Sequence, residues 1–407
     1  MLLWRCGLNI SNLKDVLLKQ IGLTKIPADV NARDEDWLDQ TPLHDAHHPR
    51  EVRRLLDAGA DIEARDGLGN TPLHSVTSEG AVIELIKAGA DINAQNNQGE
   101  TPLFNARGQG DARALIAAGA DIHARDNRGK TPLFGASEGA LRELVKAGAD
   151  INARDTQGNT PLFGAHNDSL KALLKAGADV SARNNEGQTP LFRATGQTEA
   201  RALIAAGADI LARDNRGRTP LFEANTGALK ELLKAGLDPA ASDDQGNQPL
   251  HIARDPEAVA LLTRAGADVI ARRMDGQAPI HRAIFPETIE ALAKAGADMN
   301  AQDNNGNTSL HAGRDATVWS ALIEAGADPH IQNQKGEAPI NSGKPFFNDL
   351  RAQERAKLLV SLLPPANAWK PPEGGFGADA KRQVGAAMKA HGQDSQTQEA
   401  PRLRARF

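Results

Sequence analysis

The chain has 407 residues, of which 40% are apolar, and a formal net charge of −5 at pH 7. So mild a charge gives no reason to expect nucleic acid or an anionic membrane as the main partner. The single cysteine, Cys6, excludes an intramolecular disulfide framework and a Cys-based zinc site. No apolar run is long enough for a signal peptide or a membrane span, so we expect a soluble cytoplasmic protein.

Residues 1–40 are expected to form an N-terminal capping helix and a first loop. Ser11 precedes a helical pattern of apolar residues that ends at Gly22. The loop that follows, from Asn31 to Gln40, is longer than the later loops and carries Trp37. An array of stacked units needs such a cap because its open end would otherwise expose apolar surface.

Residues 41–337 form an array of about ten similar segments of 29 or 30 residues. Their landmark is a Thr-Pro-Leu-His-like tetrapeptide, which begins at Thr41, Thr71, Thr101, Thr131, Thr160, Thr189, Thr219, Gln248, Ala278, Thr308 and Ala338. A fixed period of this length is typical of a solenoid, in which each unit buries its apolar face against its neighbours.

One segment, residues 71–100, shows what each unit is expected to form. Thr71 is expected to cap a short helix with its hydroxyl group, with Pro72 at the first helical position. Val82 and Leu85 belong to an apolar face that predicts a second helix, which ends at Gly89. The polar residues that follow predict a hairpin-like loop.

The string DxxGxTPLH at residues 66–74, followed by AGADINA at residues 88–94, resembles the ankyrin repeat. The resemblance covers roughly residues 28–341 and implies an all-α solenoid of helix-turn-helix-hairpin-loop units. It also implies a concave protein-binding face formed by loop tips and first helices. The usual ankyrin unit has 33 residues, and the residues missing here fall in the first helix and the turn after it.

The C-terminal part is expected to differ from the array. Residues 338–363 are interpreted as a capping repeat and helix, with Phe346 and Phe347 before the helix. Residues 364–407 are rich in Pro, Gly, Gln and Ala, and we expect a disordered tail. The tail is interpreted as solubilising, with a secretion signal or a partner-docking segment as the alternatives.

Two patterns suggest chemistry, but each has a simpler explanation. Residues 135–139 match the G-x-S-x-G elbow, but a helix start precedes Ser137 where that motif requires a strand. His47 and His48 lie beside Asp45, but zinc needs three or four converging ligands. We therefore expect no enzyme activity, no cofactor and no metal.

The fourth residue of the tetrapeptide is His in five segments and Phe in the five segments from Phe104 to Phe222. The resemblance implies that this histidine is a structural hydrogen-bonding residue that bridges to the adjoining loop. The five Phe residues are expected to replace that bond with apolar stacking. The alternative is an exposed aromatic strip that binds a partner.

Comparison of the copies shows that the loop tips vary most, and these positions are free of the demands of the repeated frame. Large apolar residues and arginine are common anchors at interfaces. The predicted partner-binding residues are Trp37, Leu68, Arg128, Lys130, Glu186, Arg216, Arg218, Met274 and Lys335.

The sequence therefore predicts a monomeric, non-enzymatic scaffold that binds another protein. Its Ala-rich, Tyr-free, short-period array is typical of bacteria, which favours an inhibitor or immunity protein. The alternatives are a bacterial effector, secreted into a host cell without a cleavable signal peptide, and a self-associating structural protein. The sequence does not name the partner.

Overall fold

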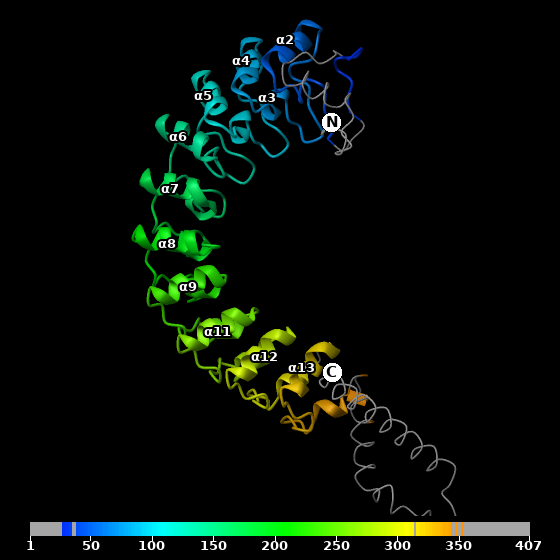
Figure 1. Ribbon diagram of the computed structural model, residues 1–407, viewed down its shortest axis with the longest axis vertical. Helices are drawn as coiled ribbons and strands as arrows, with labels where there is room; N and C mark the ends of the chain where they lie inside the picture. The colour runs from blue at the N-terminus through cyan, green and yellow to red at the C-terminus, as the bar shows by residue number, and fades with distance from the viewer. Residues whose placement is uncertain are drawn as a thin grey trace, which may run out of the picture. The chain divides into compact units, whose positions relative to one another are not determined.

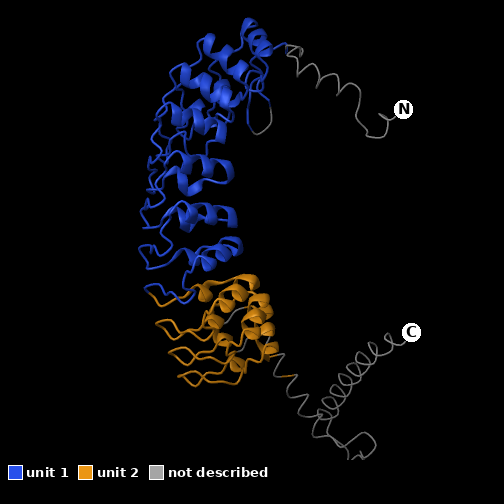
Figure 2. Cartoon of the chain, turned by 60° about the vertical axis from the view of Figure 1, so that its left-hand side comes forward, with its two compact units in different colours: residues 1–244 blue, residues 245–407 orange. Residues whose placement is uncertain are grey.

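The computed structural model describes residues 27–34, 38–312, 315–342, 345, 347–348 and 352. The predicted N-terminal helix, Trp37, the tail and all but residues 348 and 352 of the predicted C-terminal helix lie outside the described residues. The chain divides into two compact units, residues 1–244 and residues 245–407 (Figure 2). Every regular element among the described residues is a helix, so the chain is all-α, as predicted.

Unit 1 contains pairs of short helices that follow one another along the chain (Figure 1). Its helices are α2 (Pro49–Asp57), α3 (Pro72–Ser75), α4 (Glu79–Lys87), η1 (Pro102–Asn105), α5 (Gln109–Ala117), α6 (Glu138–Lys146), η2 (Pro161–Gly164), α7 (Asn167–Lys175), η3 (Pro190–Arg193), α8 (Gln197–Ala205), η4 (Pro220–Phe222) and α9 (Thr226–Lys234). The first helix of each pair is a single turn, and the second has nine residues.

Unit 2 repeats the same pairing. Its helices are α10 (Pro249–Ile252), α11 (Pro256–Arg264), η5 (Pro279–Arg282), α12 (Pro286–Lys294), η6 (Ser309–Ala312), α13 (Ala316–Glu324) and η7 (Pro339–Asn341). No helix in the described part of the chain is both long enough and apolar enough to cross a bilayer.

The difference between 29-residue and 30-residue segments lies in the turn between the paired helices. Helix α4 begins eight residues after Thr71, whereas α6 begins seven residues after Thr131. Both second helices then run for nine residues. The shorter segments therefore lose a residue from the connection and keep the helix that packs.

Helix α4 shows why the second helix begins and ends where it does. Ser78 caps it, because the Ser78 hydroxyl accepts the N–H of Ala81 at 3.2 Å. Gly89 ends it with φ +93°, a left-handed conformation that glycine adopts without a steric cost. The N–H of Ala90 then reaches back to the carbonyl of Leu85 at 3.1 Å and satisfies one terminal acceptor.

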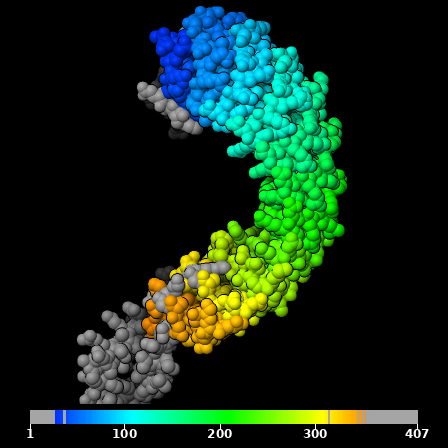
Figure 3. Space-filling model, turned by 180° about the vertical axis from the view of Figure 1, so that it is seen from behind, coloured from blue at the N-terminus to red at the C-terminus, as the bar shows by residue number. Residues whose placement is uncertain are grey.

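The core of unit 1 is mainly aliphatic and continuous from segment to segment. Leu73, Val82 and Leu85 are at most 2% exposed. Each second helix packs against the second helices of the neighbouring segments, in the order α2, α4, α5, α6, α7, α8 and α9. The gradual change of colour along unit 1 in the space-filling view shows the same succession of neighbours (Figure 3).

Thr71 occupies the N-cap position, as predicted, and forms a capping box with His74. The imidazole ring provides its half of the box, since its Nδ1 accepts the backbone N–H of Thr71 at 3.1 Å. Its Nε2 lies 3.0 Å from the carbonyl oxygen of Glu100, the residue before the next tetrapeptide. The Thr71 hydroxyl lies 3.0 Å from the same Nδ1 atom, so the ring contacts both the start of the one-turn helix and the carbonyl at the end of the following loop.

The bridging role that the resemblance implied for histidine is confirmed, and it occurs in both units. The same contact with a following carbonyl is made by His44, His74, His251, His281 and His311. Where Phe replaces His, Phe163, Phe192 and Phe222 are buried, so the alternative of an exposed aromatic strip is wrong for them. The hydroxyl groups of Thr101, Thr160, Thr189 and Thr219 are buried in these segments without a hydrogen-bond partner.

Candidate protein-interaction surface

The loop tips are fixed by an acidic or amide side chain at the base of each turn. In the loop that ends at Lys130, Asp126 Oδ1 accepts the N–H of Arg128 at 2.9 Å and that of Lys130 at 2.7 Å. The equivalent residues of the other loops that make these two contacts are Asp66, Asn96, Asp155, Asn184, Asp214, Asp303 and Asn333. The backbone of these tips is therefore the same, whatever side chain each carries.

Successive tips are joined to one another by backbone hydrogen bonds. In unit 1 the N–H of Asn127 donates to the carbonyl of Gln98 at 2.8 Å, and that of Thr156 donates to the carbonyl of Arg128 at 2.9 Å. From the second loop onward, the carbonyl-bearing residues of unit 1 form a row, here called the tip row, of Leu68, Gln98, Arg128, Gln157, Glu186 and Arg216. All six are exposed.

A glycine is required at the tip because two loops approach closely there. Gly69 has φ +77°, which L side chains rarely adopt. A Cβ atom at Gly69 would lie 2.5 Å from Oδ1 of Asn97 in the next loop. The side chain of Asn97 in turn donates to the carbonyl of Gly67. The missing side chain therefore leaves room for the amide that joins the loops.

The structure brings four of the predicted partner-binding residues together. Leu68, Arg128, Glu186 and Arg216 all belong to the tip row, at the same position of different loops. In unit 2, Lys335 is exposed at the equivalent position, and Met274, which is 74% exposed, occupies the adjacent one.

The other predicted residues are placed differently. Lys130 lies at the base of its loop and is half-buried. Arg218 is also at a loop base, and its side chain is 18% exposed. Trp37 lies outside the described residues.

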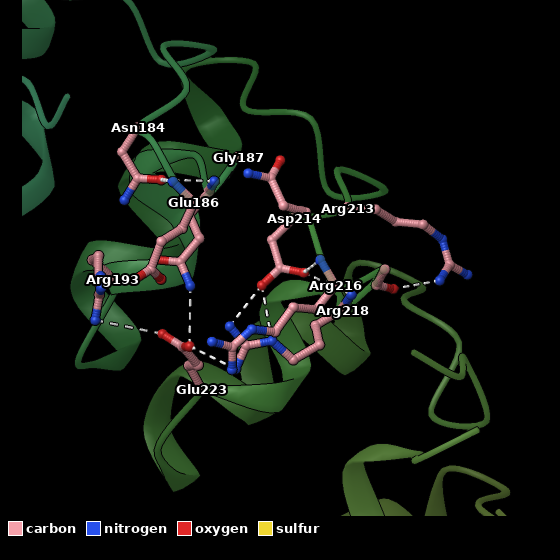
Figure 4. Close-up of polar contacts among 12 residues, drawn as sticks. Asn184, Glu186, Gly187, Arg193, Arg213, Asp214, Arg216, Arg218 and Glu223 are labelled. Atoms are coloured by element: carbon pink, nitrogen blue, oxygen red, sulfur yellow. Dashed lines mark hydrogen bonds and ion pairs between the residues drawn. The ribbon is translucent and has the colours of Figure 1, made fainter. Parts of the chain in front are cut away.

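Arg218 belongs to a charge network within unit 1 (Figure 4). Its guanidinium lies 2.6 Å from Asp214 Oδ2 and 3.1 Å from Glu223 Oε1. Two further residues contact the carboxylate of Glu223: Gln188, the last residue of the preceding segment, and Arg193, in the same segment as Arg218. The network therefore holds three consecutive segments together and leaves Arg218 little surface to offer a partner.

The network shifts the pKa values of Asp214 and Arg218. Burial alone would raise the pKa of the Asp214 carboxyl, but the N–H groups of Arg218 and Arg216 and the Arg218 guanidinium outweigh it and lower that pKa. Burial would likewise lower the pKa of Arg218, but the bond with Asp214 raises it. Both groups are charged at neutral pH, which is what an ion pair in this position requires.

Sequence reasoning missed a second row on the same loops. Arg125, Arg154, Arg183 and Arg213 precede the acidic or amide residue that fixes each turn. Figure 4 shows Arg213 pointing away from the Asp214, Arg218 and Glu223 cluster. The sequence contains an Ala-Arg-Asp/Asn string in each of four consecutive segments. Because this arginine does not vary among them, it is not found among the variable positions.

The patterns that suggested chemistry have structural roles. Ser137 caps α6, because its hydroxyl accepts the N–H of Ala140 at 3.3 Å. His47 lies 3.8 Å from Asp45. Among the residues that the structure describes, no group of three or more His, Cys, Asp or Glu could hold a metal ion.

Comparison with known families agrees with this architecture. Residues 73–155, 134–214 and 161–243 match a family model described as ankyrin repeats (3 copies). Residues 43–84 match a model described as ankyrin repeats (many copies). No curated protein matches the chain.

Proposed function

The chain is an ankyrin-repeat protein, and we propose that it is a non-enzymatic scaffold that binds a partner protein through its loop tips. Ankyrin repeats are generally protein-interaction modules. The observation that carries the proposal is the tip row, in which one fixed backbone presents six exposed side chains of four kinds, apolar, amide, cationic and anionic.

The tip row has the properties of a recognition surface. Leu68 is apolar, Arg128 and Arg216 are cationic, and Glu186 is anionic, although all occupy the same position of the loop. The frame uses only their backbone atoms, so the side chains are free to be matched to a partner. Complementary charge and a few large anchors give an interface its specificity.

The Met274 loop in unit 2 supports the same proposal. Arg273 stands where most of the other loops have the Asp or Asn that fixes the turn. Met274 takes a position that is often Asn, and it cannot make the side-chain amide bond that Asn304 makes to the Met274 carbonyl at 2.9 Å. A polarizable, 74% exposed thioether is a suitable interface anchor.

We propose further that the protein acts by binding and occupying its partner, and that this binding is its whole activity. A bacterial inhibitor or immunity protein would act in this way within the cell that makes it, and an effector would do so on a host protein. A structural protein that self-associates would differ from both in mass. Light scattering on the purified chain of 43.2 kDa separates a monomeric binder from a self-associating one.

The test is affinity capture from the native cell with wild type and two variants. The tip variant carries Leu68→Ser, Arg128→Ser, Arg216→Ser and Met274→Ser. A matched control carries Leu211→Ser, Ile270→Ser, Lys146→Ser and Lys175→Ser, which removes two exposed apolar and two cationic side chains elsewhere.

We expect wild type and the control to capture the same partner and the tip variant to lose it. If the tip variant retains every partner in unchanged amounts, the tip row is not the binding surface.

A further inference from the structure

We propose that Arg125, Arg154, Arg183 and Arg213 form a rail that binds an extended acidic segment of a partner polypeptide. The inference rests on the proposed function, since it takes the ligand to be a protein. It names a surface separate from the tip row and the chemistry that this surface would recognise. All four arginines belong to unit 1.

Each arginine of the rail is held in place by two backbone carbonyl groups. The Nη1 atom of Arg125 donates to the carbonyl oxygens of Gly129 and Arg154, both at 2.7 Å. The other three make the same two contacts, one to their own tip glycine and one to the next loop, at 2.5–3.4 Å. The side chain of each of the first three rail arginines is thus hydrogen-bonded to the backbone carbonyl of the next rail arginine.

These contacts use only one of the three guanidinium nitrogens. All four residues are exposed, and no ion pair joins any of them to a carboxylate in the described part of the chain. The Nη2 and Nε atoms are left to bind a ligand. Because the side chains are already ordered, little further rotamer entropy is lost when a carboxylate arrives.

The spacing of the rail suits an extended peptide. One arginine is contributed by each consecutive segment, and stacked helices lie roughly 8–10 Å apart. An extended chain advances about 3.3 Å per residue, so carboxylates at every third residue would meet successive arginines. Arginine binds a carboxylate through two parallel hydrogen bonds, which favours this ligand over a diffuse anion.

A second row on the same loops favours a peptide over a nucleic acid. Asp121, Asp150, Asp179 and Asp209 are exposed, one in each loop, four positions before the arginine. A nucleic-acid strand carries a charge on every nucleotide and would be repelled by this row. A polypeptide can place uncharged or basic residues there.

The chain itself supplies the substitution that tests the rail. In unit 2, Gln302 occupies the position of the rail arginines, and its Nε2 donates to the carbonyls of Gly306 at 2.8 Å and Gln332 at 3.0 Å. Glutamine therefore makes both structural bonds without a charge. Arg→Gln at the four rail positions should remove the ligand contacts and keep the loops.

The probe is a fluorescein-labelled peptide with the sequence Glu-Ser-Gly repeated four times, titrated by polarisation at low salt. We expect saturable binding to the full wild-type chain and binding at least tenfold weaker to the quadruple rail variant. The control variant changes Lys146, Lys171, Lys175 and Lys234 to Gln and loses the same charge from the second helices. Its affinity should stay within threefold of wild type.

Several outcomes would overturn the proposal. The first is that wild type does not bind the peptide, and the second is that the rail variant and the lysine control lose affinity equally. The third is that wild type binds a peptide with four contiguous glutamates as tightly as the spaced peptide. Tighter binding of a thymidine oligonucleotide of equal charge would assign the row to nucleic acid. Thermal unfolding of the rail variant within a few degrees of wild type confirms that the loops are intact.

Failure of the rail is distinguishable from failure of the proposed function. If wild type captures its partner through the tip row but does not bind the peptide, the rail proposal alone is refuted. A tip variant that captures every partner unchanged refutes the tip row, whatever the peptide does.

Discussion

The Nε2 atom of His74 lies 3.0 Å from the carbonyl oxygen of Glu100, the last residue of the same segment. The other ring nitrogen accepts the N–H of Thr71, so one neutral imidazole joins the first helix of the segment to the loop that ends it. In the next segment Phe104 takes this position, and the hydroxyl of Thr101 is buried without a hydrogen-bond partner. One chain therefore contains a polar and an apolar form of the same junction.

The first prediction is that His74→Phe destabilises unit 1, although Phe is native to the next segment. The substitution leaves the buried N–H of Thr71 unpaired, which costs about 1–3 kcal/mol. Urea unfolding at pH 7 measures the loss. Phe104→Ala is the control for apolar packing at this position, and an unchanged midpoint in His74→Phe would contradict the bridging role.

The second prediction concerns pH. Burial lowers the pKa of His74, His251 and His281. As the pH falls below about 6.5, these histidines therefore bind more protons in the unfolded chain than in the folded chain, and the folded state is destabilised. The contribution is fully present above pH 6.5 and is lost below it.

The unfolding midpoint should accordingly fall between pH 7 and pH 5, and the deficit of His74→Phe relative to wild type should shrink over that interval. A deficit that stays constant would mean that His74 titrates normally in the folded chain.

The third prediction is that Arg218→Gln destabilises unit 1 by about 1–3 kcal/mol, because it leaves the buried carboxylate of Asp214 without its cation and Glu223 with Arg193 alone. Arg216→Gln, at an exposed position two residues away, should change stability by less than about 0.5 kcal/mol. Chemical denaturation of the two variants at pH 7 makes the comparison.

The same pair has an acid dependence. The pKa of Asp214 is lowered in the folded chain, so its stabilising contribution is present above about pH 3.9 and is lost as the pH falls below that value. The difference between Arg218→Gln and wild type should therefore narrow in that range. Equal destabilisation by Arg216→Gln would contradict the assignment.

The fourth prediction compares two glycines with similar backbone angles. Gly59 has φ +90° and open space where a Cβ would lie, whereas a Cβ at Gly69 would lie 2.5 Å from Asn97 Oδ1. Gly59→Ala should cost about 1–2 kcal/mol for the left-handed conformation. Gly69→Ala should cost about 1–3 kcal/mol more because of the clash, and equal costs would show that the loops separate freely.

The helices can be predicted from the sequence because their determinants are local. The spacing of Val82 and Leu85 and the glycine at position 89 lie within one segment. The part that His74 plays is harder to predict, because its ring contacts the N–H of Thr71 and also the carbonyl of Glu100, which is 26 residues away. The loops are predicted to be hairpin-like, and those that the structure describes are tight turns without strands.

The site is less predictable. The burial of Arg218 depends on Glu223, which lies in the following segment, and on Gln188, which lies in the preceding segment. The rail escapes prediction for a different reason. Arg125 and its equivalents repeat from segment to segment, as residues of the frame do, but a side chain fixed through Nη1 still has donors to offer.

The tip-to-tip hydrogen bonds have a consequence for how such a gene can change. In unit 1 each loop gives one N–H to its predecessor and offers one carbonyl to its successor, as Asn127 and Arg128 do. A duplicated repeat would bring its own N–H donor and its own carbonyl acceptor. Both tip-to-tip hydrogen bonds, to the preceding and to the following loop, could therefore form. Recombination between copies can therefore lengthen or shorten this array by whole repeats, and each event adds or removes one side chain of the tip row.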